Sequence, residues 1–313
     1  MRYAPEKVVA LLDTERAGET EQGFPIFGSV DDALRLEPNT ALVGVATSGG
    51  RFPPAFRAQI RSCVEHGLDV ENGLHEFLTA DDDLVDLAGE HGVELRDLRK
   101  PPTDLNVPTG ENLEVPARIV LTVGSDCAIG KMTVALELER EAKRRGVASQ
   151  FVPTGQTGIA IAGWGISVDA VIADFIAGAA ERLVLEGHAR GGELLIVEGQ
   201  GSLLHPQYSG VTLGLFHGSA PHLLVLCHVA GQRFVDDDER FPIPPLSDLV
   251  ELHERTSLIA RPSRVACIAL NTRALGEDEA RRAIEQAENE TGLPADDPVR
   301  FGAEKLSAAL VGD

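Results

Sequence analysis

The sequence predicts an α/β protein of two domains, each built on a parallel sheet, on the strength of three observations. Short apolar runs alternate with runs of helical periodicity in both halves, and strands separated by helices usually pair in parallel. The chain has 313 residues, more than one compact domain usually takes. Residues 101–116 hold four prolines and no apolar periodicity. We therefore expect domains at residues 1–105 and 117–313, joined by a linker at 106–116.

The N-terminal half reads as a small Rossmann-like domain. Ser29 can cap a helix that begins near Asp31, because its hydroxyl can accept a hydrogen bond from the first turn. The apolar run at Ala41–Thr47 is typical of a strand buried on both faces. Further strands are expected at Val8–Asp13 and Val93–Leu98, and helices at Pro54–His66 and Asp81–His91.

The C-terminal half repeats this alternation and predicts a P-loop NTPase-like, doubly wound parallel sheet. Its first strand, Ile119–Val123, runs into a loop, and a helix follows from Lys131 to about Arg145. Later strands are expected at Ser149–Val152, Leu194–Glu198, His222–Leu226 and Val265–Leu270, with helices near Asp169–Leu185, Leu246–Thr256 and Asp278–Thr291.

The run GSDCAIGKMT at residues 124–133 predicts a phosphate-binding P-loop between that first strand and its helix. Glycines let successive backbone N–H groups turn toward phosphate oxygens, and the helix adds the positive end of its dipole. Lys131 would neutralise phosphate charge. The run departs from the usual GxxxxGK[ST] pattern, because five residues separate Gly124 from Gly130 and Met132 precedes Thr133. The binding residues expected here are Gly124, Ser125, Asp126, Cys127, Ala128, Ile129, Gly130, Lys131, Met132 and Thr133.

The composition excludes several classes of partner. A net charge of −21, spread over both halves, repels nucleic acid and anionic membranes and suits a halophilic cytoplasm. No apolar run approaches the roughly 20 residues of a membrane span. The N-terminus does not resemble a signal peptide, so we expect a soluble cytoplasmic protein. The four cysteines lack metal-ligand or disulfide spacing and are expected to pack as small apolar side chains, Cys127 included.

Two features of the second half resemble dethiobiotin synthetase and related ATPases. Their P-loop reads G-T-D-x-x-x-G-K-T, which is the spacing seen here. An acidic residue at a strand end approaches the metal or substrate in that class, and Glu198 in the run VEGQGS takes this place. The resemblance implies an ATP- and Mg²⁺-dependent kinase or ligase in which Thr133 and Glu198 hold the metal. Glu198 could instead be a solvent-facing acid at a strand end.

Six longer runs of the second half are distinctive, and they read GSDCAIGKMTVALEL, PTGQTGIAIAGWGISVDAV, VEGQGSLLHPQYSGVTLGL, LCHVAGQR, FPIPPLSDLV and ALNTR. They resemble the D-glutamate N-acetyltransferase-like family, which pairs an N-terminal Rossmann-like domain with a C-terminal P-loop domain. The resemblance implies acetyl transfer from acetyl-CoA to the amine of an acidic amino acid such as D-glutamate, with the P-loop holding the CoA phosphates. The ATP-dependent enzyme is the alternative, and a CoA- or nucleotide-sensing protein without catalysis is a third reading.

Acetylation of an amine needs a general base, and three residues are candidates. Glu198 is preferred. Asp169, which follows a glycine-rich turn, is second, although it could simply be a favourable acid at a helix N-terminus. His205 is third, although the proline that follows it could mean that it only ends a turn.

The acceptor's carboxylates call for cationic and N–H groups. We expect Arg233 and the glycine-rich loop that contains Thr154, Gln156 and Thr157 to supply them. Asn271 would contact the adenine base, although a strand-end cap explains it equally well. The partners expected are therefore a small amino-acid substrate and a second copy of the chain, since dimers are the commonest assembly of such enzymes.

Overall fold

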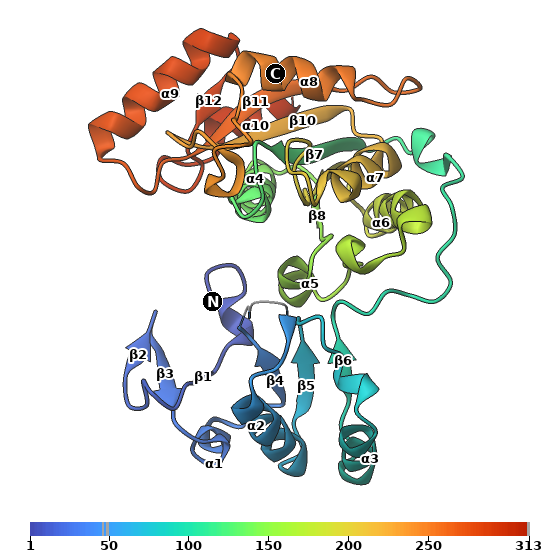
Figure 1. Cartoon of the computed structure of the whole chain (residues 1–313), viewed down its shortest axis with the longest axis vertical. Helices are drawn as coiled ribbons and strands as arrows, with labels where there is room; N and C mark the ends of the chain where they lie inside the picture. The colour runs from blue at the N-terminus through green and yellow to red at the C-terminus, as the bar shows by residue number, and fades with distance from the viewer. Residues whose placement is uncertain (46, 48–49, 312–313) are drawn as a thin grey trace. The chain divides into compact units, whose positions relative to one another are not determined.

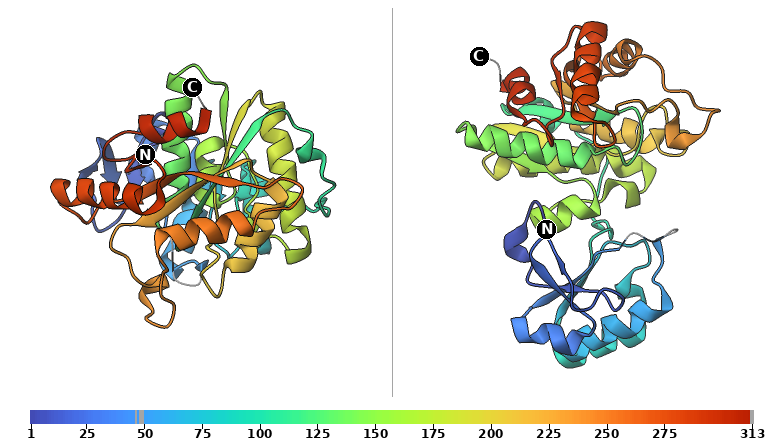
Figure 2. Two further views of the ribbon diagram at one scale, coloured as in Figure 1. Left: turned by 90° about the horizontal axis from the view of Figure 1, so that it is seen from above. Right: turned by 90° about the vertical axis from the view of Figure 1, so that its left-hand side faces the viewer.

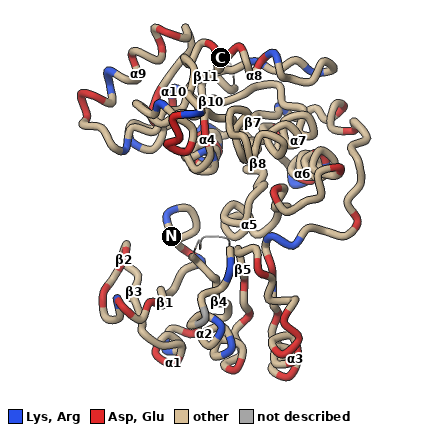
Figure 3. The backbone as a smooth tube through the Cα atoms, in the orientation of Figure 1, with Lys and Arg blue, Asp and Glu red and all other residues tan. Residues whose placement is uncertain are grey.

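The computed structural model describes residues 1–45, 47 and 50–311 and divides into two compact units, residues 1–100 and 101–313 (Figure 1). Both units are α/β, as the sequence predicts. Asp and Glu residues are distributed along both of them (Figure 3). Among the described residues, no helix is long and apolar enough to cross a membrane.

The first unit contains two three-stranded sheets with short helices. Strands β1, β3 and β2 form one sheet, in which β1 and β3 are parallel. Strands β4, β5 and β6 form a parallel sheet in that order, and Val64 and Val70 lie in the core beneath it. The bounds are β1 Leu11–Leu12, β2 Thr20–Glu21, β3 Phe24–Phe27, α1 Val30–Ala33, β4 Thr40–Val43, α2 Pro54–Glu65, β5 Asp69–Asn72, α3 Asp82–His91 and β6 Leu95–Asp97, with 3-10 turns at Pro5–Lys7, Leu34–Leu36 and Leu78–Ala80.

The parallel sheet and the helix cap of the first unit are confirmed. The Ser29 hydroxyl caps α1 by accepting a hydrogen bond from the Asp32 N–H at 3.2 Å. The prediction that the run at Ala41–Thr47 is buried on both faces is wrong. Its strand β4 is an edge strand, and Leu42 is 53% exposed. Position 46 of that run lies outside the described residues. The sequence does not predict strand β5, because its four residues, DVEN, include a single apolar one.

The second unit holds a six-stranded, all-parallel sheet in the order β12-β11-β10-β7-β9-β8. Its strands are β7 Arg118–Gly124, β8 Ser149–Val152, β9 Leu194–Val197, β10 Leu223–Val229, β11 Arg264–Asn271 and β12 Ala295–Asp296. Its helices are α4 Lys131–Arg144, α5 Gln156–Ala162, α6 Ile176–Ala189, α7 Ser209–Ser219, α8 Leu246–Arg255, α9 Glu277–Thr291 and α10 Glu304–Val311, with 3-10 turns at Glu111–Leu113, Val168–Ala170, Ala173–Phe175 and Val235–Asp237.

The connections that follow the neighbouring strands β7 and β9 cross the sheet in opposite directions, and this reversal positions the site. From β7 the chain passes to β8 and β9 on one side of the sheet's centre, and then to β10, β11 and β12 on the other. Crossover connections between parallel strands are right-handed. Two connections that cross the sheet in opposite directions therefore place their helices on opposite faces. Accordingly α4 packs with α10, whereas α6 packs with α7 and α8 with α9 (Figure 2). The doubly wound prediction is confirmed, and such sheets bind ligands beyond the strand ends at the reversal.

Two elements of the second unit differ from the prediction. Helix α6 begins at Ile176, not near Asp169, because Val168 N donates to Thr154 O at 3.0 Å and holds the preceding segment in a 3-10 turn. The stretch Thr154–Gly158, expected as a glycine-rich loop, instead leads directly into α5, whose N-cap is Gly155.

Residues 106–116 pack closely on the second unit. Thr109 N and Gly110 N each donate to the Glu181 carboxylate of α6, both at 2.6 Å. Gly178 must lack a side chain, since a Cβ there would come within 1.7 Å of Asn106 O. This stretch therefore runs along α6 in a fixed path.

Candidate functional site

The loop of residues 125–130 joins the end of β7 to the start of α4, as the P-loop prediction requires. Gly130 is the N-cap of α4 with φ of +109°, a conformation that favours glycine. Gly124 is also required, because a Cβ there would lie 2.5 Å from Ile129 Cδ1 and 3.1 Å from Cys227 O. The two glycines therefore shape the loop. The first N–H groups of α4 have no partner within the helix and can bind an anion beyond the end of β7.

Lys131, the first residue of α4, is buried and turns back over the loop. Its Nζ donates to Asp126 O at 2.7 Å. Burial lowers the pKa of Lys131 from its ordinary value, while the charges of Asp126 and Glu198 oppose this shift. Its stem lies against Gly199, where a Cβ would come within 3.1 Å of Lys131 Cδ and within 1.7 Å of Thr122 O. The ammonium group is thus held at the loop by a backbone oxygen.

The Asp126 carboxylate is fixed from two directions. Oδ1 accepts from Cys127 N at 2.6 Å. Oδ2 accepts from Gln232 Nε2 and from Asp236 N, both at 2.7 Å. The sequence analysis does not indicate these contacts, because Gln232 and Asp236 lie more than 100 residues from Asp126 in the chain. The backbone of Asp236, at φ +52°, aims its N–H at the P-loop.

Glu198 follows β9 directly and is 4% exposed, so the reading of a solvent-facing acid is wrong. Its Oε2 accepts from Thr154 N at 2.9 Å and Gly155 N at 3.1 Å, and the Thr154 hydroxyl donates to Glu198 O at 2.6 Å. Burial raises the pKa of Glu198 to about 7 against these two N–H bonds, with Asp169 adding to the rise and Lys131 opposing it. A buried carboxylate that titrates near neutrality suits proton transfer.

The start of α5 encloses the Glu198 carboxylate. A Cβ on Gly158 would lie 2.4 Å from Glu198 Oε2, and one on Gly155 would lie 2.5 Å from Gln200 Nε2. Gln200 Nε2 in turn donates to the Thr154 hydroxyl at 3.2 Å. Of the side chains predicted to bind substrate here, Thr154 is buried, Gln156 half-buried and Thr157 exposed. The glycines therefore serve close packing around Glu198.

The other two candidate bases lie in different settings. Asp169 is exposed and accepts from the Ser167 hydroxyl at 2.7 Å. His205 is buried, and ligand-type atoms of His205, Asp126 and Cys127 all lie within 4.8 Å of one another, so His205 adjoins the P-loop. Its Nδ1 accepts from Gln207 N at 3.2 Å, which leaves the proton of the neutral ring on Nε2. In that form His205 can donate a hydrogen bond from Nε2, and its role as a general base stays a prediction.

Arg233 and Asn271 complete the predicted set. Arg233 is exposed, with its guanidinium 5.7 Å from the centre of the Phe234 ring. Asn271 ends β11, donates to Ile129 O at 3.3 Å and accepts from Arg273 N at 3.2 Å. Both ends of its amide are therefore engaged, one of them with the P-loop itself, and the adenine contact stays a prediction.

One group of described residues could hold a metal ion, namely Asp126, Cys127 and His205. Its fit is poor, because both Asp126 oxygens already accept hydrogen bonds and His205 Nδ1 faces an N–H. Thr133 lies half-buried in the first turn of α4, and its metal role with Glu198 stays a prediction of the ATP reading.

The sequence matches two family models. Residues 12–101 match the DUF1611_N Rossmann-like domain and residues 106–307 match the DUF1611_C P-loop domain, both described as domains of unknown function. A crystal structure of a DUF1611 family protein from Anabaena variabilis is 41% identical and superposes with a TM-score of 0.91, covering 98% of this chain and 91% of that chain.

Two curated relatives are also similar over most of their length. A D-glutamate N-acetyltransferase from a Pseudoalteromonas species is 36% identical over 283 residues, which is 90% of this chain and 84% of the relative. A D-glutamate N-acetyltransferase from Tritonibacter scottomollicae is 37% identical over 286 residues, again 90% of this chain and 84% of the relative.

Proposed function

The chain belongs to the DUF1611 family, and from this premise we propose that it is an N-acetyltransferase that moves the acetyl group of acetyl-CoA to the amino group of D-glutamate or a related acidic amino acid. The single observation that carries the chemistry is Glu198, a buried carboxylate with a pKa of about 7 beside a P-loop. The names of the two relatives support the reaction and the acceptor.

The P-loop would hold the phosphates of acetyl-CoA. Coenzyme A carries a pyrophosphate and a 3′-phosphate, so the N-terminus of α4 and the Lys131 ammonium can bind it without any hydrolysis of a nucleotide. The binding residues are those of the loop, 124–133. A phosphate oxygen would replace Asp126 O as the acceptor from Lys131.

Acetyl transfer then needs one proton removed and one oxyanion stabilised. The acceptor amine attacks the thioester carbonyl carbon, a C–N bond forms, and Glu198 takes the amine's proton. The carbonyl oxygen gains negative charge, and the Nε2–H of His205 is a donor that can stabilise it. The C–S bond then breaks, and the CoA thiolate leaves and takes up the proton that Glu198 removed from the amine, which returns Glu198 to its ionised form. Arg233, with Thr154, Gln156 and Thr157, would bind the acceptor's carboxylates.

Ligand-dependent stability tests this proposal first. Acetyl-CoA and CoA should raise the thermal unfolding midpoint, because a ligand that binds the native state alone stabilises it by mass action. ATP with Mg²⁺, which lacks the 3′-phosphate of coenzyme A, should raise the midpoint less than acetyl-CoA does. Release of the free CoA thiol should follow addition of D-glutamate and should be slower with L-glutamate. Stabilisation by Mg²⁺-ATP alone, with ADP release, would support the kinase or ligase in which Thr133 and Glu198 hold the metal.

Salt dependence tests the habitat that the charge suggests. With a net charge of −21, mutual repulsion of carboxylates should weaken as KCl screens them. We therefore expect the unfolding midpoint to rise between about 0.1 M and about 2 M KCl, where the Debye length falls from about 10 Å to below 3 Å. A midpoint that stayed level or fell would contradict a halophilic adaptation.

A further inference from the structure

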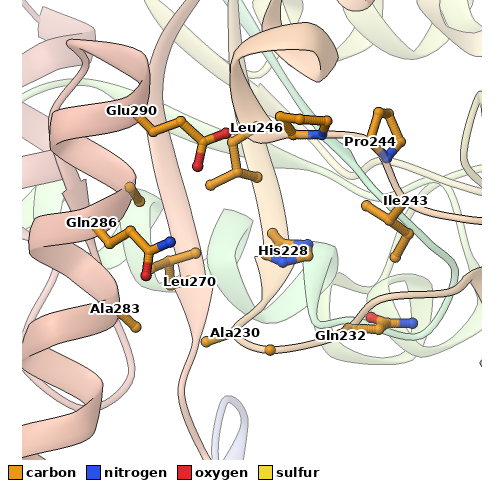
Figure 4. A pocket seen from close by; sticks show the side chains of 13 residues that line it. His228, Ala230, Gln232, Ile243, Pro244, Leu246, Leu270, Ala283, Gln286 and Glu290 are labelled. Atoms are coloured by element: carbon orange, nitrogen blue, oxygen red, sulfur yellow. The ribbon is translucent and has the colours of Figure 1, made fainter.

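A cavity of about 180 Å³ lies in the second unit beside the ends of β10 and β11, against α8 and α9 (Figure 4). Strand β10 and the loop after it contribute His228 and Gln232, and α9 contributes Ala283 and Gln286. The acetyl transfer described above gives none of these residues a role. The cavity is only partly enclosed, so a ligand can enter it.

Two hydrogen bonds join this cavity to the P-loop. His228 Nδ1 lies 2.9 Å from the Ser125 hydroxyl. Gln232 Nε2 donates to Asp126 Oδ2 at 2.7 Å. Ser125 and Asp126 are consecutive residues of the loop, so a ligand whose phosphates occupy the loop has the cavity next to it.

The lining selects a neutral ligand with a flat apolar face. Its floor is formed by buried Leu246 and Leu270, and prolines 244 and 245 close one wall. Among the described residues that line it, none is Lys or Arg, and Glu290 adds a carboxylate. An anionic group, such as the side chain of D-glutamate or a phosphate, would be repelled there.

Gln232 lines this cavity, and its amide has one buried acceptor without a partner. Both hydrogens of its amide are engaged, because Nε2 donates to Asp126 Oδ2 at 2.7 Å and to Phe234 O at 3.0 Å. Its Oε1 is buried and has no hydrogen-bond partner among the described residues. In Figure 4 the amide nitrogen points away from the other labelled side chains. The two acceptors around Nε2 prevent the amide from flipping, so the ligand must bring a donor.

We propose that this cavity binds the adenine ring of acetyl-CoA, with the exocyclic amine of adenine donating to Gln232 Oε1. The inference rests on the proposed function, in which the P-loop holds the CoA phosphates. Adenine is flat, uncharged and carries the required donor, and the walls of Leu246, Leu270 and Pro244 would cover its faces. The cavity would thus fix the nucleotide end of the cofactor and leave the thioester free to reach Glu198.

Binding of adenosine 3′,5′-bisphosphate, the nucleotide part of CoA, provides the test. Calorimetry compares wild type with Ala283→Phe, which fills the cavity from α9, and with Asn289→Phe, an exposed control on the same helix. Ala283→Phe should weaken binding of this nucleotide by about tenfold or more and leave binding of pyrophosphate unchanged. Asn289→Phe should change neither. Equal affinity of Ala283→Phe and wild type for the nucleotide would overturn the proposal.

The Gln232 contact has its own test in the base of the ligand. Inosine 3′,5′-bisphosphate carries a carbonyl oxygen where adenine has its amine, and two acceptors would face each other. Wild type should bind it about tenfold or more weakly than the adenosine compound. Equal binding would overturn the Gln232 contact. Neither measurement depends on turnover, so a chain that binds the adenosine compound yet transfers no acetyl group would contradict the proposed function and keep the adenine site.

Discussion

Replacing Glu198 by glutamine should lower kcat for acetyl transfer by about 10²–10⁴-fold, the usual contribution of a general base. Glutamine has the same shape, and its amide oxygen can still accept from Thr154 N and Gly155 N. The fold should therefore survive, and the thermal midpoint should not fall. The measurement is kcat at saturating acetyl-CoA and D-glutamate, with the midpoint of each variant as the check on folding.

The pH profile shows whether the lost group is Glu198. A base must be ionised, so kcat/KM of wild type should rise tenfold per pH unit below about 7 and level off above it. Asp169→Asn is the matched control: removal of its charge should lower the pKa of Glu198 and shift the profile to lower pH with little loss of the plateau. A large loss of kcat/KM in Asp169→Asn, with none in Glu198→Gln, would show that Asp169 and not Glu198 is the general base.

The same pKa shift has a consequence for stability with a definite sign. The folded chain keeps the Glu198 proton up to pH about 7, whereas the unfolded chain loses it near the ordinary value of 4.5. Between these values the folded state binds more protons, so this carboxylate makes the free energy of unfolding fall as pH rises. In Glu198→Gln that part of the pH dependence should be absent.

Replacing Lys131 by alanine should weaken binding of acetyl-CoA by about 1.5–3 kcal/mol, which is about 10- to 150-fold in Kd. The ammonium is the buried cation of the loop, and its loss leaves the phosphates with backbone N–H groups alone. Calorimetry with CoA, and with pyrophosphate as the minimal probe, measures the change.

Lys143→Ala is the matched control for Lys131→Ala, because it removes an equal charge from the exposed end of the same helix. It should leave Kd within about twofold of wild type, since salt screens the interaction between an exposed charge and a distant phosphate. An unchanged Kd in Lys131→Ala would remove the P-loop from the binding site. Equal losses in both variants would show a general effect of charge.

Much of the second unit could be predicted because its signals are local. A buried apolar run predicts strand β7, and helical periodicity predicts helix α4. The two glycines of the loop are required because a side chain would not fit at Gly124 and the backbone at Gly130 has a positive φ. Gln232 and Asp236 could not be predicted, because their contacts with Asp126 span 106 and 110 residues of sequence. The burial of Glu198 depends in the same way on α5, which folds over it from a different part of the chain.

The first unit was predicted less well, for a related reason. Its strands are short and half-exposed, so their hydrophobic pattern is weak. The position of each strand in the sheet, and not this pattern, decides which residues pair. Strand β5 reads DVEN, yet it is the central strand of its sheet, where Val70 supplies the core contact and Asn72 donates to Asp97 Oδ1 at 2.8 Å. Pairing across 25 residues stabilises a strand that its own composition does not indicate.

Burial of Lys131, whose Nζ donates to Asp126 O, couples ligand binding at the loop to protonation of this side chain. Burial holds the pKa of Lys131 below its ordinary value before a ligand arrives, and a phosphate beside the ammonium will raise it again. Where Lys131 is partly deprotonated, binding must therefore draw protons from solution. The enthalpy of CoA binding at alkaline pH will then depend on the ionisation enthalpy of the buffer, and affinity for the cofactor will decline with increasing alkalinity even though the carboxylate base stays active.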